Sequence, residues 1–178
     1  MSIRPWKVIS STRPRKHLRI DTCEAPNGKI IETMILEFGT WATIVAVTKQ
    51  QEIILIRQYR HGAGKVIWET PGGLVEPGES PLHAAQRELL EESGYSAGTW
   101  VELGPISPNP DNHTNLMYSF LALDAEKVAA QNLDATEEIE VYPTPVGEVI
   151  RMARDGELLQ ALHVSALFLA LVHMGRVK

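Results

Sequence analysis

The sequence contains a single cysteine, Cys23, among its 178 residues. An intramolecular disulfide and a thiolate zinc cluster are therefore excluded, and we expect the protein to work in the reducing cytoplasm. The sequence also has no run rich in lysine or arginine, and its net charge is −5. Proteins that hold nucleic acid by its phosphates usually carry a basic face, so we expect no nucleic-acid partner.

Long apolar runs are missing as well. The most apolar segment, residues 161–174, is interrupted by His163, Ser165 and His173 and falls short of the roughly 20 residues that span a bilayer. We expect this segment to form a helix packed on the core, and we expect no membrane partner. The first seven residues lead into no apolar stretch, so we expect no secretory signal.

The sequence does contain enough apolar material for a core, since 44% of its residues are hydrophobic. That content and length suit one domain, or one domain with a small extension. The dipeptide Asn27-Gly28 suits a two-residue hairpin turn. We expect strands at 18–24, 29–38, 41–47, 52–56, 66–69, 99–103, 116–123 and 138–142, and helices at 81–92, 145–154 and 161–174. This order predicts the α/β class, with a mixed sheet and helices on both faces.

The first of these helices carries an acidic face. Ser80 can cap its start, and Gly94 is a good terminator. Glu88, Glu91 and Glu92 are three and four residues apart, so they share one face. Because like charges at these spacings repel, a bound divalent cation would stabilise the helix, and oxygen ligands suit Mg²⁺ or Mn²⁺. A solvated acidic face is the alternative for the cluster taken alone.

The residues around this cluster follow a fixed pattern. Gly73 is followed after five residues by Glu79, and seven residues later come Arg87-Glu88-Leu89, Leu90 and Glu91-Glu92-Ser93-Gly94-Tyr95. This pattern resembles the Nudix box at each fixed position, with Tyr95 where an aliphatic residue is more usual. The resemblance implies a hydrolase that cleaves the pyrophosphate of a nucleoside diphosphate linked to another group. It also implies Mg²⁺ as cofactor, with Mn²⁺ as a substitute.

Segments outside the box resemble the ADP-ribose pyrophosphatase branch of that family. They are Arg-Gln-Tyr-Arg at 57–60, Trp-Glu-Thr-Pro-Gly-Gly at 68–73 and Thr-Glu-Glu-Ile-Glu-Val at 136–141. The likeness implies a Nudix α/β/α sandwich over residues 41–178, preceded by an antiparallel strand extension over residues 1–40. It also implies a homodimer in which the extension contacts the partner subunit, and cleavage of ADP-ribose to AMP and ribose 5-phosphate.

The resemblance also assigns roles in the box. Glu88 and Glu92 become the principal metal ligands, joined by the backbone carbonyl of Gly72. Glu91 contacts the metal directly or through water, and we place it and Arg87 with the catalytic machinery. The resemblance pairs Arg87 with Glu79 as an ion pair that fixes the loop against the helix; two ordinary surface charges are the alternative.

Hydrolysis also needs a base that takes a proton from the attacking water. In the ADP-ribose branch a glutamate on a loop after the sheet has this role. By resemblance we choose Glu137 first, with Glu138 or Glu140 as alternatives. For each of these side chains, a solvated loop carboxylate without a catalytic role is the other interpretation.

Five further residues are candidates for contact with the substrate. Arg57 and Arg60 could bind phosphate, because guanidinium groups hold phosphate oxygens in pairs. Trp6 could stack on the base, in preference to Trp41, and Glu69 could touch the ribose or serve as a buried structural partner. The fifth is Pro110, which stands fifteen residues after Tyr95, where the ADP-ribose branch commonly has a proline; the loop that contains it could close over the substrate.

Two departures from the branch leave the substrate open. The usual Ser-Pro-Gly is replaced by Ser-Pro-Asn-Pro at 107–110, and the usual Leu-Pro-Ala-Gly by Thr-Pro-Gly-Gly at 70–73. GDP-mannose, other nucleotide sugars and dinucleotides are therefore alternatives to ADP-ribose. A non-catalytic sensor of a nucleotide metabolite is the alternative from another class, and the intact set of box glutamates favours the enzyme.

Overall fold

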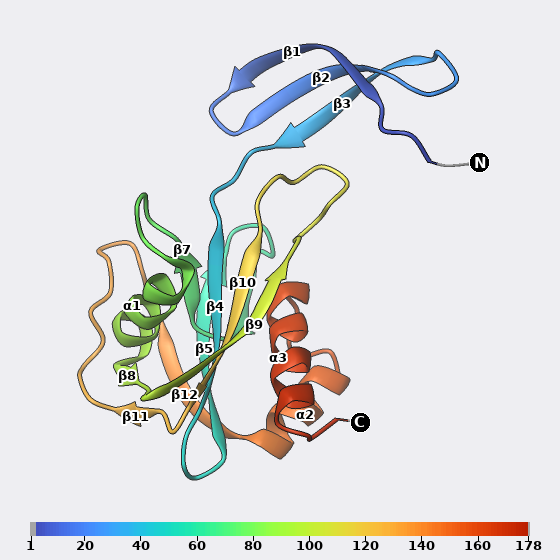
Figure 1. Ribbon diagram of the computed structural model, residues 1–178. Coiled ribbons are helices and arrows are strands. Elements are labelled where there is room, and N and C mark those ends of the chain that lie inside the picture. Colours follow the sequence, from blue (N-terminus) through green and yellow to red (C-terminus); the bar gives the residue numbers. More distant parts are fainter. Residues whose placement is uncertain (1–2, 178) are drawn as a thin grey trace. The chain divides into compact units, whose positions relative to one another are not determined.

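The computed structural model describes residues 3–177 and divides into two compact units (Figure 1). The N-terminal unit extends to Gly39 and also includes the segment Ser107–Leu116. The second unit consists of Thr40–Ile106 and the chain from Met117 onward. The segment 107–116 thus leaves the second unit between two of its strands and belongs structurally to the first.

The N-terminal unit is an antiparallel sheet in the order β1-β2-β3, with β1 at Lys7–Arg15, β2 at Leu18–Glu24 and β3 at Ile30–Leu36. The predicted hairpin joins β2 and β3, but the expected two-residue turn is wrong. Glu24 pairs with Ile30, and the N–H of Ala25 donates to the carbonyl of Lys29 at 2.9 Å. A turn at residues 27–28 alone would need an N–H from Pro26, which proline does not have.

Strand β1 has no counterpart among the expected strands. Every residue from Lys7 to Arg15 is exposed, so the sequence lacks the apolar and polar alternation of a half-buried strand. Two register shifts, at Val8/Ser10 and Thr12/Arg15, interrupt its pairing with β2. Its pairing with β2, more than burial of its own side chains, therefore holds this edge strand in place.

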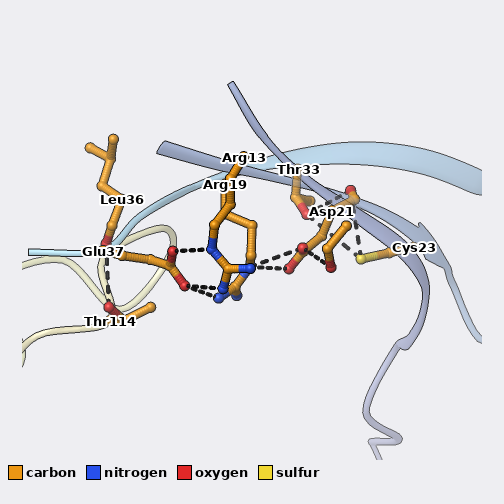
Figure 2. A network of polar contacts seen from close by, with 9 residues as sticks. Arg13, Arg19, Asp21, Cys23, Thr33, Leu36, Glu37 and Thr114 are labelled. Carbon is orange, nitrogen blue, oxygen red and sulfur yellow. Dashed lines mark hydrogen bonds and ion pairs between the residues drawn. The ribbon is translucent and has the colours of Figure 1, made fainter. Parts of the chain in front are cut away.

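Hydrogen bonds tie the end of β3 to the 107–116 segment. The N–H of Leu36 donates to the carbonyl of Asn112 at 2.7 Å, and the N–H of Thr114 donates to the carbonyl of Leu36 at 3.1 Å. Glu37 accepts hydrogen bonds from both Arg13 and Arg19, and Arg19 also binds Asp21 at 2.9 Å (Figure 2). These contacts link all three strands and the segment into one unit.

The second unit is built on a mixed sheet in the order β12-β5-β4-β10-β9, with β6 paired to β5 and β7 paired to β4. Strands β4 and β10 are parallel, and the other pairs are antiparallel. The bounds are β4 (Trp41–Val47), β5 (Glu52–Arg60), β6 (Lys65–Glu69), β7 (Gly72–Leu74), β9 (Thr99–Ile106), β10 (Met117–Leu123) and β12 (Glu140–Pro145). A short pair lies apart from this sheet, formed by β8 (Tyr95–Ser96) and β11 (Glu126–Lys127).

Both faces of this sheet are covered by helices (Figure 1). Along β4, Val45 and Val47 pack into the core beneath α2 (Val146–Arg154) and α3 (Ala161–His173), whereas Ile44 packs on the opposite side. That opposite side is covered by α1 (Pro81–Ser93). Because neighbouring side chains of a strand point to opposite faces, one apolar strand serves both cores. The predicted α/β class and α/β/α layering are confirmed.

The three helices lie within a residue or two of their expected positions. Strand β5 is longer than the expected 52–56, because its polar end pairs with β6 from Ile56↔Glu69 to Arg60↔Lys65. Arg57 and Arg60 therefore lie within the strand. No helix of residues 3–177 is long and apolar enough to cross a membrane.

Candidate active site

A cavity of about 770 Å³ lies in the second unit. Its walls come from the acidic face of α1, the start of β4, the end of β5, strand β7, the loop before β12 and the start of α3. The residues used below that line it are Trp41, Thr43, Gln58, Arg60, Gly72, Gly73, Arg87, Glu88, Glu92, Asp134, Glu137, Gln160 and His163. Residues from distant parts of the chain thus meet in one place.

Helix α1 has the ends that the sequence predicts. The hydroxyl of Ser80 accepts a hydrogen bond from the N–H of His83 at 3.2 Å, which caps the first turn. Gly94 ends the helix with a left-handed φ of 73°, and its N–H donates to the carbonyl of Leu90. These fixed ends set which side chains of the helix face the cavity.

Glu92 is the most buried of the acidic side chains of α1, with 4% of its surface exposed. Its Oε2 accepts a hydrogen bond from the N–H of Gly72 at 2.8 Å. Burial raises the pKa of Glu92 to about 8, and the negative charges of Glu88 and Glu137 act in the same direction. The carboxyl group therefore needs a proton or a cation beside it at neutral pH.

Glu88 lies against the backbone of β7. A Cβ placed on Gly73 would come within 2.3 Å of its Oε1, so a larger residue at this position would displace the carboxylate. Gly72 is equally confined, because a Cβ there would lie 2.3 Å from the carbonyl oxygen of Ala42. Burial also raises the pKa of Glu88. The two glycines thus bring backbone close to both carboxylates.

Arg87 joins the loop before α1 to the helix itself. Its guanidinium binds Glu79 through two hydrogen bonds of 3.1 Å and donates to the carbonyl of Leu74 at 3.0 Å. The expected ion pair of Arg87 and Glu79 is therefore present in the structure. Arg87 also contacts Glu88 at 2.7 Å and Glu91 at 3.1 Å. Its hydrogen bond lowers the pKa of Glu79, so that carboxylate stays charged.

The oxygen atoms at this end of the cavity fit a small divalent cation. Within residues 3–177 no three acidic, imidazole or thiol groups already converge on one point. Glu88 and Glu91 are instead turned toward Arg87, and Glu92 toward the N–H of Gly72. Mg²⁺ commonly takes only one or two carboxylates and fills its other positions with water and substrate phosphates. The buried carboxylate of Glu92 and the half-buried one of Glu88, beside an approachable backbone, suit that requirement.

The three glutamates considered as the base lie in different surroundings. Glu137 lines the cavity, and its Oε2 accepts a hydrogen bond from the N–H of Asp134 at 3.0 Å. Glu140 accepts a hydrogen bond from the hydroxyl of Tyr142 at 3.0 Å and lies 3.8 Å from Arg57. Glu138 is exposed. The choice of Glu137 stays a prediction, and its place in the cavity favours it.

The two arginines of β5 point to different partners. Arg60 lines the cavity and binds Glu69, with its Nη2 2.8 Å from Oε2. Arg57 lies over the ring of Trp68, 5.0 Å from its centroid, and is outside the described lining of the cavity. Arg60 is therefore the better placed of the two to meet a phosphate in this cavity.

Glu69 is fully buried and also accepts a hydrogen bond from Gln58 at 2.9 Å. Burial alone would raise the pKa of Glu69, but the nearby His163 and the hydrogen bonds from Arg60 outweigh it and lower the pKa. These contacts resemble those of a structural partner more than those of a ribose ligand. Trp6 and Pro110 belong to the N-terminal unit, and their contact with substrate stays a prediction.

Sequence reasoning missed two residues at the start of α3. Gln160 and His163 both line the cavity, and His163 contacts Thr70, far away in the sequence. The one available signal was His163 itself, a polar residue that interrupts the apolar pattern of its helix. Trp41, the tryptophan given second place for base stacking, lines the cavity.

The chain matches the family model of the NUDIX domain over residues 39–162. It is 29% identical over 145 residues to the ADP-ribose pyrophosphatase of Bacillus subtilis, covering 81% of this chain and 78% of that protein. It is 31% identical over 152 residues to the ADP-ribose pyrophosphatase of Mycobacterium tuberculosis, covering 83% and 72%. A GDP-mannose pyrophosphatase of an Enterobacter species is 30% identical over 161 residues, covering 79% and 83%. The crystal structure of an ADP compounds hydrolase superposes with a TM-score of 0.84 at 26% identity, covering 99% of this chain and all of the other.

Proposed function

This chain belongs to the Nudix family, in its ADP-ribose pyrophosphatase-like branch, and we propose that it hydrolyses ADP-ribose to AMP and ribose 5-phosphate with Mg²⁺. One observation carries the proposal. The carboxylates of Glu88, which is half-buried, and Glu92, which is buried, line the same cavity as Arg60 and Glu137. A pyrophosphate needs a site for a cation, a cationic side chain and a base, and these residues can supply all three.

Glu88, Glu92 and the backbone carbonyl of Gly72 would hold Mg²⁺, with Glu91 acting directly or through water. When bound, the ion neutralises charge on the pyrophosphate and lowers the pKa of a bound water. The raised pKa values of Glu88 and Glu92 support this assignment, because a cation offsets the cost of burying two like charges side by side.

Two side chains take part in the reaction in this proposal. Arg60 binds the phosphate oxygens, with Arg57 as the second candidate. Glu137 takes a proton from the attacking water as the water oxygen bonds to phosphorus. The bond between that phosphorus and the bridging oxygen then breaks, and the electron pair stays on the leaving phosphate. Arg87 holds Glu79, Glu88 and Glu91 in place without touching the substrate.

One other substrate class has specific support, and a sensor is the alternative from another class of function. The GDP-mannose pyrophosphatase relative supports a nucleotide sugar as substrate, with the same residues in the same roles. A sensor that binds a nucleotide metabolite without cleaving it would use the same cavity but would not need both carboxylates at the metal end.

We also infer that the protein works as a homodimer in the cytoplasm. Ile30 and Met34 share one face of β3, and each has 53% of its surface exposed. Exposed apolar side chains grouped on one sheet face are typical of a surface that binds another protein. The single cysteine agrees with a reducing compartment.

The test is to incubate the protein with Mg²⁺ and each of ADP-ribose, GDP-mannose, other nucleotide sugars, dinucleotides and nucleoside triphosphates, and to separate the products by chromatography. We expect AMP and ribose 5-phosphate from ADP-ribose, with loss of turnover on chelation and in Glu92→Gln. Faster cleavage of another compound would change the substrate assignment and leave the proposed mechanism intact. Tight binding of one compound without any turnover would show a sensor and refute the enzyme.

A further inference from the structure

His163 lies in the first turn of α3, with 7% of its surface exposed. Its Nδ1 is 2.8 Å from the hydroxyl of Thr70 and 3.3 Å from the N–H of Thr70. The hydroxyl of Thr43, on β4, lies 2.9 Å from that of Thr70 and 3.4 Å from Nδ1. One imidazole nitrogen therefore meets a backbone group and two buried hydroxyls.

The backbone N–H of Thr70 fixes the direction of the hydrogen bond to His163, because its role is unambiguous. The backbone N–H of Thr70 can only donate, so Nδ1 of His163 accepts and a neutral ring carries its proton on Nε2. Nε2 faces Oε1 of Glu69 at 3.6 Å. Nδ1 thus contacts Thr70 while Nε2–H points at Glu69, and the two partners are consecutive in the chain. Glu69 in turn binds Arg60, the proposed phosphate ligand.

The segment that begins at Thr70 leads straight to the proposed metal ligands. The carbonyl of Pro71 accepts a hydrogen bond from the N–H of Ile44 at 2.9 Å, and the N–H of Gly72 binds Glu92 at 2.8 Å. No side chain of Gly72 or Gly73 restrains this backbone. Its position is therefore set by its neighbours, and Thr70 is its buried anchor on the α3 side.

We propose that His163 is a positioning residue of the metal site, holding Thr70 so that the backbone of Gly72 stays beside Glu92 among the residues that would hold the cation. The inference rests on the proposed function, since it assumes that Gly72, Glu88 and Glu92 hold a cation. Helix α3 thereby acts on the metal end of the cavity, although its own residues are not proposed ligands. Outer partners that orient metal ligands typically contribute about 10–100-fold in metal affinity or activity.

A buried histidine can also contribute to packing alone. The positioning role depends on Nδ1, which contacts Thr70, whereas a packing role depends on neither ring nitrogen. In His163→Asn the amide oxygen takes about the place of Nδ1 and can still accept from Thr70. In His163→Gln the amide nitrogen takes about the place of Nε2, so the contact with Glu69 is kept and that with Thr70 is lost. The proposal requires Asn to preserve metal binding and Gln to weaken it, whereas simple packing favours neither.

The experiment titrates Mn²⁺ into the full-length protein without substrate and follows the free ion by electron paramagnetic resonance. We expect His163→Gln to weaken Mn²⁺ binding about 10-fold or more, and His163→Asn to bind close to wild type. The matched control is His173→Gln, the same substitution at an exposed position of the same helix. The Mg²⁺ concentration for half-maximal hydrolysis should shift in parallel, with KM for ADP-ribose at saturating Mg²⁺ nearly unchanged.

Thr70→Val provides a second variant in case His163→Gln does not fold. Valine keeps the shape of threonine and removes the hydroxyl that bonds to Nδ1 and to Thr43, so Mn²⁺ binding should weaken. Its control is Thr48→Val, which removes a buried hydroxyl that accepts from the N–H of Glu52 in the turn after β4. Thr48→Val should lower the melting temperature without changing Mn²⁺ binding.

The outcomes separate this inference from the proposed function. Equal Mn²⁺ binding by wild type, His163→Gln and Thr70→Val would refute the positioning role while leaving a metal-dependent hydrolase. Equal loss in His163→Asn and His163→Gln would assign the effect to packing, which also refutes it. Failure of the wild type itself to bind Mn²⁺ would refute the metal site of the proposed function, and this inference with it.

Discussion

Glu92 shows how burial and charge act together on a single side chain. It is nearly inaccessible to solvent, it accepts one backbone hydrogen bond, and two other carboxylates lie close enough to raise its pKa further. A proton neutralises it in the metal-free protein, with a pKa of about 8. In the metal-bound protein a cation would replace that proton, because metal ligands bind in their deprotonated form.

A pH dependence of stability follows for the metal-free protein. The folded-state pKa of about 8 lies above the ordinary glutamate value of 4.5, so between these values the folded chain holds a proton that the unfolded chain releases. This contribution to stability is complete below pH 4.5, declines as the pH rises and is lost above about 8. We expect the melting temperature in the presence of chelator to fall between pH 6 and 9, and Mg²⁺ to restore it at high pH.

Glu92→Gln is the control, because an amide does not titrate and can still accept from the N–H of Gly72. Its melting temperature should change less with pH over the same range. Calorimetry in buffers of different ionisation enthalpy should show about one proton released per bound ion at pH 7. An identical slope in wild type and Glu92→Gln would contradict the assignment of this proton to Glu92.

Glu137 gives a kinetic prediction at the same scale. If it takes the proton from water, Glu137→Gln should lower kcat by about 10²–10⁴-fold while KM changes little. Single-turnover measurements at saturating Mg²⁺ would follow the chemical step. Glu138→Gln is the adjacent control and should keep nearly full activity. A normal Glu137→Gln beside an impaired Glu140→Gln would transfer the role of base to Glu140.

The sequence predicted part of this site because helical spacing alone brings some residues together. Glu88, Glu91 and Glu92 share a face by their spacing, and the family pattern paired Glu79 with Arg87. The contact of His163 with Thr70 joins residues from a strand end and a distant helix, so no local spacing could indicate it. The position of Trp41 could not be predicted from local spacing either, because only the fold shows that its strand begins at the cavity.

At the scale of elements, the best predictions were those with a local cause. The ends of α1 follow from Ser80 and Gly94, and the span of β4 from its β-branched residues. Strand β7 was missed because Gly72 and Gly73 have low intrinsic strand propensity, and its formation depends on the neighbouring edge of β4. Strand β1 was missed because nothing about it is buried.

Gly94 gives a stability prediction for α1. Its φ of 73° is unfavourable for other residues, and a Cβ there would lie 2.2 Å from the carbonyl oxygen of Ala129. Gly94→Ala should therefore cost at least about 1–2 kcal/mol from the backbone conformation alone. For a chain of this size that corresponds to a fall in melting temperature of about 2–4 °C per kcal/mol.

Gly98→Ala is a suitable comparison a few residues further on. A Cβ at Gly98 meets nothing within 4 Å, and its φ is not positive. Differential scanning calorimetry should show little change for this variant. If Gly94→Ala lowers the melting temperature no more than Gly98→Ala does, the close contact with Ala129 is relieved at low cost.

At the scale of the whole molecule, the N-terminal sheet leaves apolar side chains uncovered in a single chain. If the homodimer forms through this sheet, Met34→Asp should place a charge in the interface and convert the dimer to monomer. Light scattering coupled to size-exclusion chromatography would measure the mass. Val128→Asp is the control, since Val128 is 61% exposed and belongs to the other unit. A monomeric wild type, or a Met34→Asp variant that stays dimeric, would contradict the proposal.

The N-terminal unit is built from two separate parts of the chain, residues up to Gly39 and the segment 107–116, and this affects its folding during synthesis. During synthesis on the ribosome, β3 emerges long before the 107–116 segment that bonds to Leu36. An exposed strand end with unpaired backbone groups is a site for unwanted association. The nascent N-terminal sheet therefore stays incomplete until residues 107–116 have been synthesised. For the same reason, grafting residues 1–39 onto another protein would transfer a sheet without the segment that completes it.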